Sequence, residues 1–379
     1  MSDSNRSPNP ASKTVRKDSS NASYLVAITG ATGLVGGNLA SYLLACGYRV
    51  RAIGRSKEKL EELKRSLEPA PDADSLEIAV SEITDPTYLD KAFTGCDVVV
   101  HAAGSVDPYG SRESIFKTNL GGTKNALSTA IACNVKHFIH VSSLSVITGQ
   151  DDMYNVDESA PLRSCGESYA DSKVEAERWV MEHSREEDIE VTSVRPGFIY
   201  GPGERAWLPR LIASIEGGKA MLIDGGSKET NVIYVENLSR AIEKAILNST
   251  AYGQVYNLTD GAKITKKQLF DAIADGMGLP RVEKRIPGAV AKTACEVIST
   301  LAPFLPVEKQ RSLSRFSRAA FRLAGINQGF SIAKAEKELG YVKRISFEEG
   351  MRTTLEAFKN GSVTKEKVDN SKVLSEGRG

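Results

Sequence analysis

The chain has 379 residues, of which 41% are hydrophobic, and its 49 Lys and Arg nearly balance its 48 Asp and Glu. A formal net charge of +1 provides no overall field for nucleic acid or an acidic membrane, so neither partner is expected. The length suffices for one large nucleotide-binding unit and a smaller lobe.

Both ends of the chain are polar. Residues 1–22 are rich in Ser, Asn, Pro and Lys without an apolar run, so we expect a disordered tail and no secretory signal. Residues 362–379 are expected to form a second tail. No segment of about 18 uninterrupted apolar residues occurs, and the five cysteines show neither paired nor metal-type spacing. These features predict a cytoplasmic protein with free thiols and no metal site.

A glycine-rich turn follows the first apolar run, Tyr24–Ile28. The next residues are Thr29-Gly30-Ala31-Thr32-Gly33-Leu34-Val35-Gly36, and helical spacing continues to residue 45. A strand, a glycine turn and a helix in this order are typical of a dinucleotide-binding site. Gly30 permits the turn, Gly33 leaves room for the pyrophosphate, and Gly36 lets the helix pack on the strand. The free N–H groups at the start of the helix would bind the phosphates.

Short apolar runs typical of buried strands alternate with helical patterns through the first half of the chain. The runs are Leu25–Ile28, Val50–Ile53, Leu76–Val80, Val98–His101, His137–Val141 and Val191–Val194. This alternation predicts an α/β fold of the Rossmann type, with a doubly wound parallel sheet over residues 23–195. Beyond Pro196 the alternation is lost, although a strand–helix unit returns near residues 232–258. Residues 196–231 and 259–361 are expected to form a smaller, mostly helical lobe that binds substrate.

The second run ends in Gly54-Arg55-Ser56 and has no acid at its end. An NAD enzyme of this fold usually has Asp or Glu there, which binds the 2′-hydroxyl of the ribose. A guanidinium matches the geometry of a phosphate, so Arg55 and Ser56 would hold the 2′-phosphate of NADP. The alternative is a solvated basic loop with NAD as the cofactor. We expect NADP in preference to NAD.

Hydroxyl side chains and a Tyr–Lys pair follow the later strands. The serines of Val141-Ser142-Ser143-Leu144-Ser145 come directly after a strand that should end at the ligand-binding edge of the sheet. Tyr169 and Lys173 are four residues apart, which places them on one face of a helix. An ammonium group near the phenol would lower the pKa of Tyr169 and suit it to general acid and base catalysis.

These segments together resemble the extended short-chain dehydrogenase/reductases, within the NAD-dependent epimerase/dehydratase superfamily, over about residues 24–360. The matching segments are T-G-A-T-G-L-V-G (29–36), H-A-A-G (101–104), N-L-G-G-T (119–123), V-S-S-L-S-V (141–146), Y-A-D-S-K (169–173), R-P-G-F-I-Y-G-P-G (195–203) and I-Y-V-E-N-L (233–238). The resemblance implies that Tyr169 is the general acid and base, that Lys173 tunes its pKa on the nicotinamide ribose, and that Ser143 orients the substrate carbonyl. It also implies that Asn119 kinks a helix beside the site.

The resemblance further implies a set of cofactor contacts. Glu82 and Ile83 stand where the family commonly has Asp followed by an aliphatic residue, so Glu82 would contact the adenine. The full predicted set is Gly30, Thr32, Gly33, Leu34, Val35, Gly36, Arg55, Ser56, Glu82, Ile83, Ala102, Ala103, Gly104, Tyr169, Lys173, Pro196 and Gly197.

Two segments, Arg195–Gly203 and Gly110–Phe116, resemble the branch of 3β-hydroxysteroid dehydrogenases and 2-alkyl-3-oxoalkanoate reductases. That branch implies an apolar secondary alcohol or ketone as the substrate, either a steroid-like ring or a β-keto acid. Nucleotide-sugar enzymes of the same superfamily often carry an Arg-Asp pair where this chain has Glu229–Val232. A diphosphate clamp is therefore not evident from the sequence.

A basic helix is expected near residues 311–322, after an apolar stretch, Ile286–Phe304, that suggests a helix over a pocket. The arginines of this helix recur at helical spacing and are Arg311, Arg315, Arg318 and Arg322. They form either a solvated surface, or a lid that recruits an anionic amphiphile or touches an acidic bilayer.

The first hypothesis is therefore an NAD(P)-dependent oxidoreductase that acts on an apolar substrate through Tyr169. A nucleotide-sugar epimerase or dehydratase that retains NAD is the second hypothesis, and a non-catalytic protein that senses the cofactor is the third. By resemblance, the helical stretches Ser111–Ala132 and Tyr169–His183 would pair in a homodimer.

Overall fold

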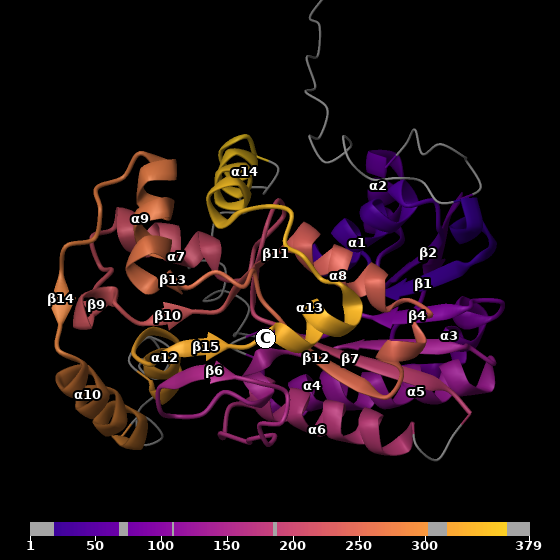
Figure 1. The fold of residues 1–379 in the computed structure, drawn as a ribbon, viewed down its shortest axis with the longest axis horizontal. Helices are drawn as coiled ribbons and strands as arrows, with labels where there is room; N and C mark the ends of the chain where they lie inside the picture. The colour runs from indigo at the N-terminus through magenta and orange to yellow at the C-terminus, as the bar shows by residue number, and fades with distance from the viewer. Residues whose placement is uncertain (1–18, 68–74, 108–109, 185–187, 302–316, 362–379) are drawn as a thin grey trace, which may run out of the picture.

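The computed structural model describes residues 19–67, 75–107, 110–184, 188–301 and 317–361. Within these ranges seven strands form one parallel sheet in the order β12-β7-β5-β4-β1-β2-β3 (Figure 1). The strands are β1 Leu25–Thr29, β2 Arg49–Gly54, β3 Leu76–Val80, β4 Val98–His101, β5 His137–Val141, β7 Glu190–Pro196 and β12 Gln254–Leu258. The order confirms the predicted doubly wound sheet, and β12 is the strand that returns after residue 232.

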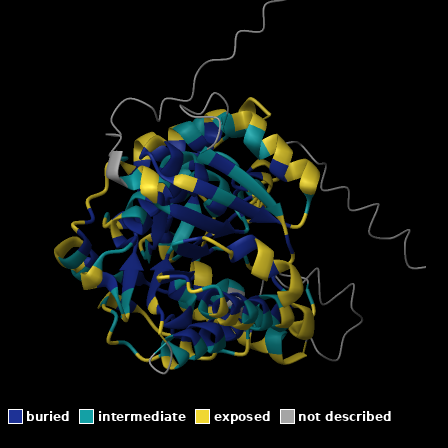
Figure 2. Cartoon of the chain, turned by 90° about the vertical axis from the view of Figure 1, so that its right-hand side faces the viewer, coloured by how far each residue is buried: buried dark blue, intermediate teal, exposed yellow. Residues whose placement is uncertain are grey.

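Helices cover both faces of the sheet. The helices of one face are α1 Leu34–Ala45, α2 Lys57–Leu67, α8 Val235–Ala245 and α13 Ala333–Leu339, and those of the other are α3 Pro86–Phe93, α5 Gly122–Ala132 and α6 Ser168–His183. Successive side chains of a strand point to opposite faces, so Val98 and Val100 enter one core and Val99 the other. Figure 2 shows the strands as buried and the outer surfaces of the helices as exposed.

The smaller lobe has its own core and lies at the left of Figure 1. Its helices are α7 Leu208–Glu216, α9 Lys266–Met277, α10 Gly288–Leu301, α12 Arg318–Ala324 and α14 Phe347–Lys359. Short strand pairs join its segments: β8 Phe198–Tyr200 with β11 Val232–Tyr234, β9 Leu222–Ile223 with β14 Arg285–Ile286, β10 Glu229–Thr230 with β13 Ile264–Thr265, and β6 Met153–Val156 with β15 Gln328–Phe330. Tyr200, Ile273 and Phe347 are among the side chains that fill its core.

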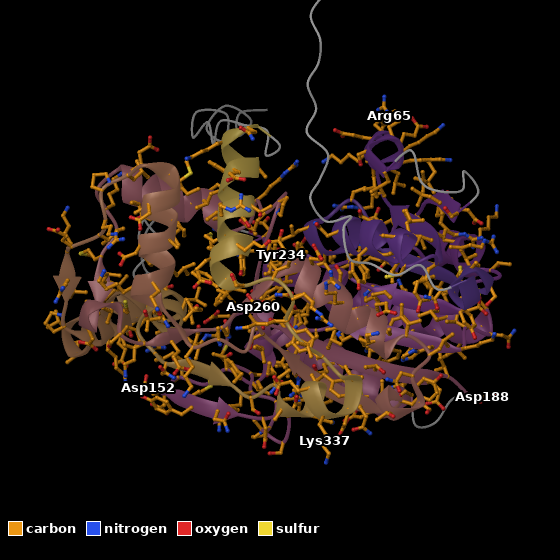
Figure 3. The ribbon with its side chains drawn as sticks, turned by 45° about the horizontal axis from the view of Figure 1, so that its top comes forward. Arg65, Asp152, Asp188, Tyr234, Asp260 and Lys337 are labelled. Atoms are coloured by element: carbon orange, nitrogen blue, oxygen red, sulfur yellow. The ribbon has the colours of Figure 1, made fainter. Side chains whose placement is uncertain are left out.

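A buried carboxylate connects the two halves. Asp260 follows β12 and accepts hydrogen bonds from the Tyr200 hydroxyl at 2.9 Å, the Tyr234 backbone N–H at 3.0 Å and the Asn237 amide at 2.9 Å. Tyr234 and Asp260 lie together between the halves in Figure 3. These bonds satisfy a carboxylate that burial would otherwise disfavour.

One prediction about the chain ends needs correction. Ser19–Ser23 form a 3-10 helix, and the Asn21 side-chain amide donates to the Cys46 carbonyl at 3.1 Å, so residues 19–22 are not part of a disordered tail. Residues 1–18 and 362–379 lie outside the described residues. The described part of the chain contains no helix long and apolar enough to cross a membrane. Its five cysteines are free thiols.

The prediction of a solvated basic face is wrong for one of the four arginines, Arg322. Arg322 is only 3% exposed, because its guanidinium pairs with the Glu167 carboxylate at 2.6 Å. Arg318 is exposed, as a solvated face requires, whereas Arg311 and Arg315 lie outside the described residues.

Candidate active site

The glycine turn after β1 has a backbone geometry that favours glycine and leaves no room for a side chain. Gly30 has φ +70°, and a methyl group on it would lie 2.8 Å from the Ala103 Cα atom. A methyl group on Gly36 would overlap the Gly30 carbonyl oxygen and lie 2.7 Å from the Ala31 Cα atom. Specific contacts in the structure therefore explain the tight turn and the close packing between helix and strand that the sequence predicts. These residues fit the pyrophosphate of a dinucleotide at the N-terminus of α1.

The remaining predicted cofactor residues surround this turn. Thr32 is exposed, and its methyl group lies 3.3 Å from where a Cβ atom on Gly54 would be, at the end of β2. Val35 packs against the core under α1, and Leu34 faces Gly203 in the loop after β8. The half-buried Ala102 and Ala103 and the exposed Gly104 follow β4. All of these positions lie at the carboxyl edge of the sheet, where ligands bind in this architecture.

The end of β2 presents a cation. The Arg55 side chain is 78% exposed, and its Nη1 atom lies 3.9 Å from Glu82 Oε1. The Ser56 hydroxyl donates to Glu58 Oε2 at 2.8 Å and accepts from the Lys59 backbone N–H at 3.2 Å. The weak, exposed pair leaves the guanidinium accessible to a phosphate.

Ile83 and Gly197 have packing roles at the edges of the cofactor region. Ile83 is buried and blocks the space that a side chain on Gly122 would need. Gly197 follows the buried Pro196, and the Asn231 carbonyl oxygen occupies the place of its missing Cβ. Packing alone therefore limits which side chains these two positions can hold, whether or not they contact a cofactor.

Ser143 and Tyr169 meet at the carboxyl edge of the sheet. Ser143 follows β5 and accepts a hydrogen bond from the Ser145 backbone N–H at 3.1 Å, which begins a short 3-10 helix. Tyr169 lies in the first turn of α6. Burial raises the pKa of Tyr169 above its ordinary value of 10.0, and a side-chain hydrogen bond with Ser143 partly opposes this effect. The two hydroxyls are therefore adjacent, as a carbonyl-activating pair requires.

The prediction that Lys173 lowers the pKa of the Tyr169 phenol needs correction. The pKa of Tyr169 is raised, because the loss of hydration outweighs the favourable contacts of the phenolate. Lys173 is buried, which lowers its own pKa to about 8, while Glu177 acts in the opposite direction. Its ammonium donates to the Val141 carbonyl at 2.9 Å. A methyl group on Gly104 would lie 3.5 Å from the Lys173 Nζ atom, so the glycine keeps the space beside this ammonium open.

Asn119 joins the loop after β4 to α6. It lies in a π-helical turn, Lys117–Gly121, between α4 Arg112–Phe116 and α5, so the helix predicted over Ser111–Ala132 is interrupted there. Its amide donates to the Ser105 carbonyl at 3.0 Å and the Ser172 hydroxyl at 2.9 Å, and its Oδ1 atom accepts from the Ser105 N–H at 2.7 Å. Asn119 therefore fixes the loop against the catalytic helix.

Two further polar residues, Glu177 on α6 and Arg195 on β7, were not singled out by the sequence analysis. Glu177 accepts from Arg195 at 2.5 Å and 3.0 Å and from the Ser193 hydroxyl at 3.1 Å, and both charged side chains are at most 5% exposed. Glu177 continues the four-residue spacing of Tyr169 and Lys173, which was the available signal. The pair holds α6 against β7 and offsets the cost of burying each charge.

His101 is a structural residue of the sheet. Its ring nitrogens contact the Thr29 hydroxyl at 2.9 Å and the Thr123 hydroxyl at 3.1 Å. Burial lowers its pKa to about 3, so the ring is neutral at physiological pH.

The fold and this arrangement of residues define a Rossmann-type protein with a Ser–Tyr–Lys site. The sequence matches the NAD dependent epimerase/dehydratase family over residues 26–259, and the chain belongs to that family. The match confirms the resemblance drawn from the motifs.

The chain is similar to proteins named for reductase and dehydrogenase activities. It is 25% identical to a 2-alkyl-3-oxoalkanoate reductase of Shewanella oneidensis, over 86% of this chain and 84% of that protein. It is 28% identical to a 3-beta-hydroxysteroid dehydrogenase of Mycolicibacterium neoaurum, over 87% of this chain and 90% of that protein. Among solved structures, it resembles a UDP-glucuronic acid 4-epimerase from Bacillus cereus in complex with UDP-glucuronic acid and NAD. That likeness has a TM-score of 0.67 at 20% identity, over 89% of this chain and 99% of the other, and concerns the fold alone.

Proposed function

We propose that this chain is an NAD(P)-dependent oxidoreductase that transfers a hydride between the nicotinamide and an apolar secondary alcohol or ketone. The observation that carries the proposal is the packing of α6, which carries Tyr169 and Lys173 one helical turn apart, against the short 3-10 helix that Ser143 begins at the carboxyl edge of the sheet. The loop Ala102–Gly104 joins these residues to the glycine turn. The names of the two relatives support the same type of reaction.

The three side chains have distinct tasks in the direction of reduction. Tyr169 donates its phenolic proton to the substrate oxygen as the hydride reaches the carbonyl carbon. Ser143 donates a hydrogen bond to the same oxygen and stabilises its developing charge. The Lys173 ammonium, one turn along the helix, stabilises the phenolate that remains. When bound, the nicotinamide supplies the hydride, or accepts it in the reverse direction.

The chain around the end of β7 bears on the choice of substrate. Phe198 and Trp207 follow β7, their ring centres are 6.5 Å apart, and both pack against the core of the smaller lobe. Arg195, at the end of the same strand, is committed to the buried pair with Glu177 and is not free to bind a diphosphate. Because Arg195 is not available to a diphosphate, the proposal favours a ring or an alkyl chain over a nucleotide sugar.

The preferred cofactor in this proposal is NADP. Arg55 is exposed and its partner Glu82 is 3.9 Å away, so a 2′-phosphate would displace Glu82 as the stronger ligand of the guanidinium. β2 itself ends in Gly54 rather than in an acid that would bind the 2′-hydroxyl of NAD.

The proposal also includes a homodimer and a cytoplasmic location. The resemblance implies pairing through α5 and α6, which lie side by side with Lys124 Nζ 5.6 Å from the ring centre of Trp179. Light scattering on the purified protein measures the mass and tests the dimer. Free thiols at all five cysteines suit a reducing compartment.

The test is the oxidation of NADPH and NADH by the purified protein with a panel of β-keto acids and ketosteroids, alongside Tyr169→Phe. We expect turnover with a member of the panel and a loss of about 10²–10⁴ in kcat in the variant, because the proton donor is removed while cofactor binding persists. The dissociation constant of NADPH, measured by its fluorescence, is the control. Turnover that survives in Tyr169→Phe would contradict the proposed acid and base. No turnover, with nicotinamide retained through purification, would favour the epimerase hypothesis.

A further inference from the structure

A part of the smaller lobe contacts the segment of chain that connects Ser143 to Tyr169. We call α12 and β15 together, residues 318–330, the clasp. β15 pairs in parallel with β6, with Gln328 opposite Met153, in the stretch between Ser143 and Tyr169. Asn327 adds a bond from its N–H to Asp152 Oδ1 at 2.7 Å and one from its amide to the Met153 carbonyl at 2.7 Å. Figure 1 shows β15 beside β6, and Figure 3 labels Asp152.

Arg322 is the charged contact of the clasp. Its Nη2 atom donates to Glu167 Oε2 at 2.6 Å and its Nη1 atom donates to the Cys165 sulfur at 2.8 Å. The Gln328 side-chain amide donates to the Arg322 carbonyl at 3.2 Å and ties α12 to β15. The Arg322 side chain is 3% exposed, so its charge is removed from water and depends on these partners.

Glu167 is the residue from which α6 begins. It precedes Tyr169 by two positions, and its carbonyl accepts the Asp171 backbone N–H at 2.9 Å, the first bond of the helix. The N–H groups of Cys165 and Gly166 donate to Asp171 Oδ1 at 2.8 Å and 3.2 Å. The start of α6 is thus held by its own Asp171 from one side and by Arg322 of the lobe from the other.

The clasp also supports the loop that carries Ser143. Phe330 packs against a small buried cluster, Leu144, Val146, Ile147 and Val174, which directly follows Ser143 and continues onto α6. One segment of the lobe therefore contacts the supports of both catalytic hydroxyls. Such dual contact is what a positioning element needs, because a displacement of about 1 Å at a reacting group can cost about 10² in rate.

We propose that Arg322 is a positioning residue for the reaction, which holds Glu167 and thereby keeps Tyr169 in register with Ser143 and the substrate oxygen. The proposal rests on the proposed function, in which Tyr169 is the acid and base. Arg322 touches neither substrate nor cofactor and acts only through the start of α6. The Arg322 side chain also covers the Cys165 thiol, which supplies a measurement independent of turnover.

The first experiment compares Arg322→Met and Arg322→Lys with Arg318→Met, an exposed arginine of the same helix. We expect Arg322→Met to lower kcat about 10- to 100-fold while the dissociation constant of NADPH changes less than about twofold, because the cofactor site is built by other elements. Arg322→Lys should recover part of kcat through a single bond to Glu167. Arg318→Met should match the wild type. A lower Tm with an unchanged kcat at 20 °C would overturn the proposal, because Arg322 would then be purely structural.

The second experiment follows the reaction of Cys165 with a maleimide in a Cys133→Ser background. Cys46, Cys96 and Cys295 are buried, so Cys165 is the main reactive thiol of that background. Burial raises the pKa of Cys165 more than Arg322 lowers it, so opening the start of α6 should speed labelling. We expect at least about tenfold faster labelling in Arg322→Met, and also in Glu167→Gln, than in Arg318→Met. Unchanged labelling in both would overturn the proposal, even in a protein with no turnover, whereas failure of the Tyr169→Phe test alone would overturn the proposed function.

Discussion

The half that contains the seven-stranded sheet and the smaller lobe each contain a buried lysine, and the two lysines differ in what surrounds them. Burial lowers the pKa of Lys173 in the first region and of Lys266 in the second to about 8. Lys173 donates to a carbonyl at the end of β5, whereas Lys266 donates to the carbonyls of Glu229 and Ile326 at 2.8 Å and 2.7 Å. The same loss of hydration thus lowers the pKa equally at the proposed catalytic Lys173 and at Lys266. A perturbed pKa identifies burial, and the neighbouring groups decide whether chemistry follows.

Free donors and free space distinguish the two ammonium groups. An ammonium has three N–H donors, and Lys173 uses one on Val141 while facing Gly104, which has no side chain to fill the space beside it. Its helix also carries Tyr169 one turn earlier. Lys266 lies at the start of α9 and donates to the Glu229 carbonyl in β10 and to the Ile326 carbonyl. It therefore joins three segments of the lobe. Lys173 is therefore placed for a ligand, and Lys266 for the integrity of the lobe.

The strongest test of this comparison is activity after the same substitution in each region. Lys173→Met should lower kcat by about 10²–10⁴, because the phenolate of Tyr169 loses its stabilising charge. Lys266→Met should keep kcat within about twofold below its melting temperature, although its Tm should fall because two buried carbonyls lose their donor. Steady-state kinetics and thermal unfolding of both variants provide the measurement. Equal losses of kcat would show that the comparison does not separate catalysis from structure.

The pH dependence of stability should be the same for both lysines. The folded protein releases these protons near pH 8 and the unfolded chain near pH 10.5, so between these values the unfolded chain binds more protons. A methionine side chain at position 266 cannot titrate. The free energy of unfolding of the wild type, relative to that of Lys266→Met, should therefore rise between pH 8 and pH 10.5, by about 3 kcal/mol at most. Urea unfolding of the wild type and of each Met variant across this range measures the difference. A difference that is flat or falls with pH would contradict the lowered pKa values.

The smallest expected effect concerns the exposed end of the nucleotide-binding half. Arg55→Ala should raise the KM for NADPH about tenfold or more and leave the KM for NADH within about twofold, because only NADPH carries the 2′-phosphate. Arg49→Ala is the matched control, since Arg49 lies at the opposite end of β2 from Arg55 and pairs with Glu77 at 3.1 Å. Parallel changes for both cofactors would instead assign Arg55 to the general stability of the loop.

Sequence analysis predicted best those features that depend on residues close together in the chain. The turn at Gly30 needs a positive φ, and the spacing of Tyr169 and Lys173 places them on one helical face by geometry alone. The alternation of apolar runs and helical patterns was sufficient for the sheet, and the strand order confirms it. The turn and the helical spacing are each decided within a few residues of chain, and the sheet was predicted from the repetition of such short patterns.

The features that sequence analysis missed join distant residues. Arg195 reaches Glu177 across 18 positions, and Arg322 reaches Glu167 across 155. Periodicity indicated that Arg322 belongs to a basic helix but could not show which arginine would be buried, because that depends on the surface that α12 meets. The sequence predicts a lowered pKa for Tyr169, whereas its pKa is raised, because burial of the phenol in the folded protein outweighs the hydrogen bond with Ser143.

The sequence by itself determined the glycine turn, the parallel sheet and the identity of the Ser, Tyr and Lys side chains at its carboxyl edge. Local sterics and periodicity were enough for these, because each depends on residues close in the chain. Only the tertiary structure decided that the C-terminal clasp supports α6, that Glu177 and Arg195 form a buried pair beneath it, and that Phe198 and Trp207 meet beyond β7. Burial and pairing of charges depend on surfaces that meet after folding, so no short stretch of sequence contains them.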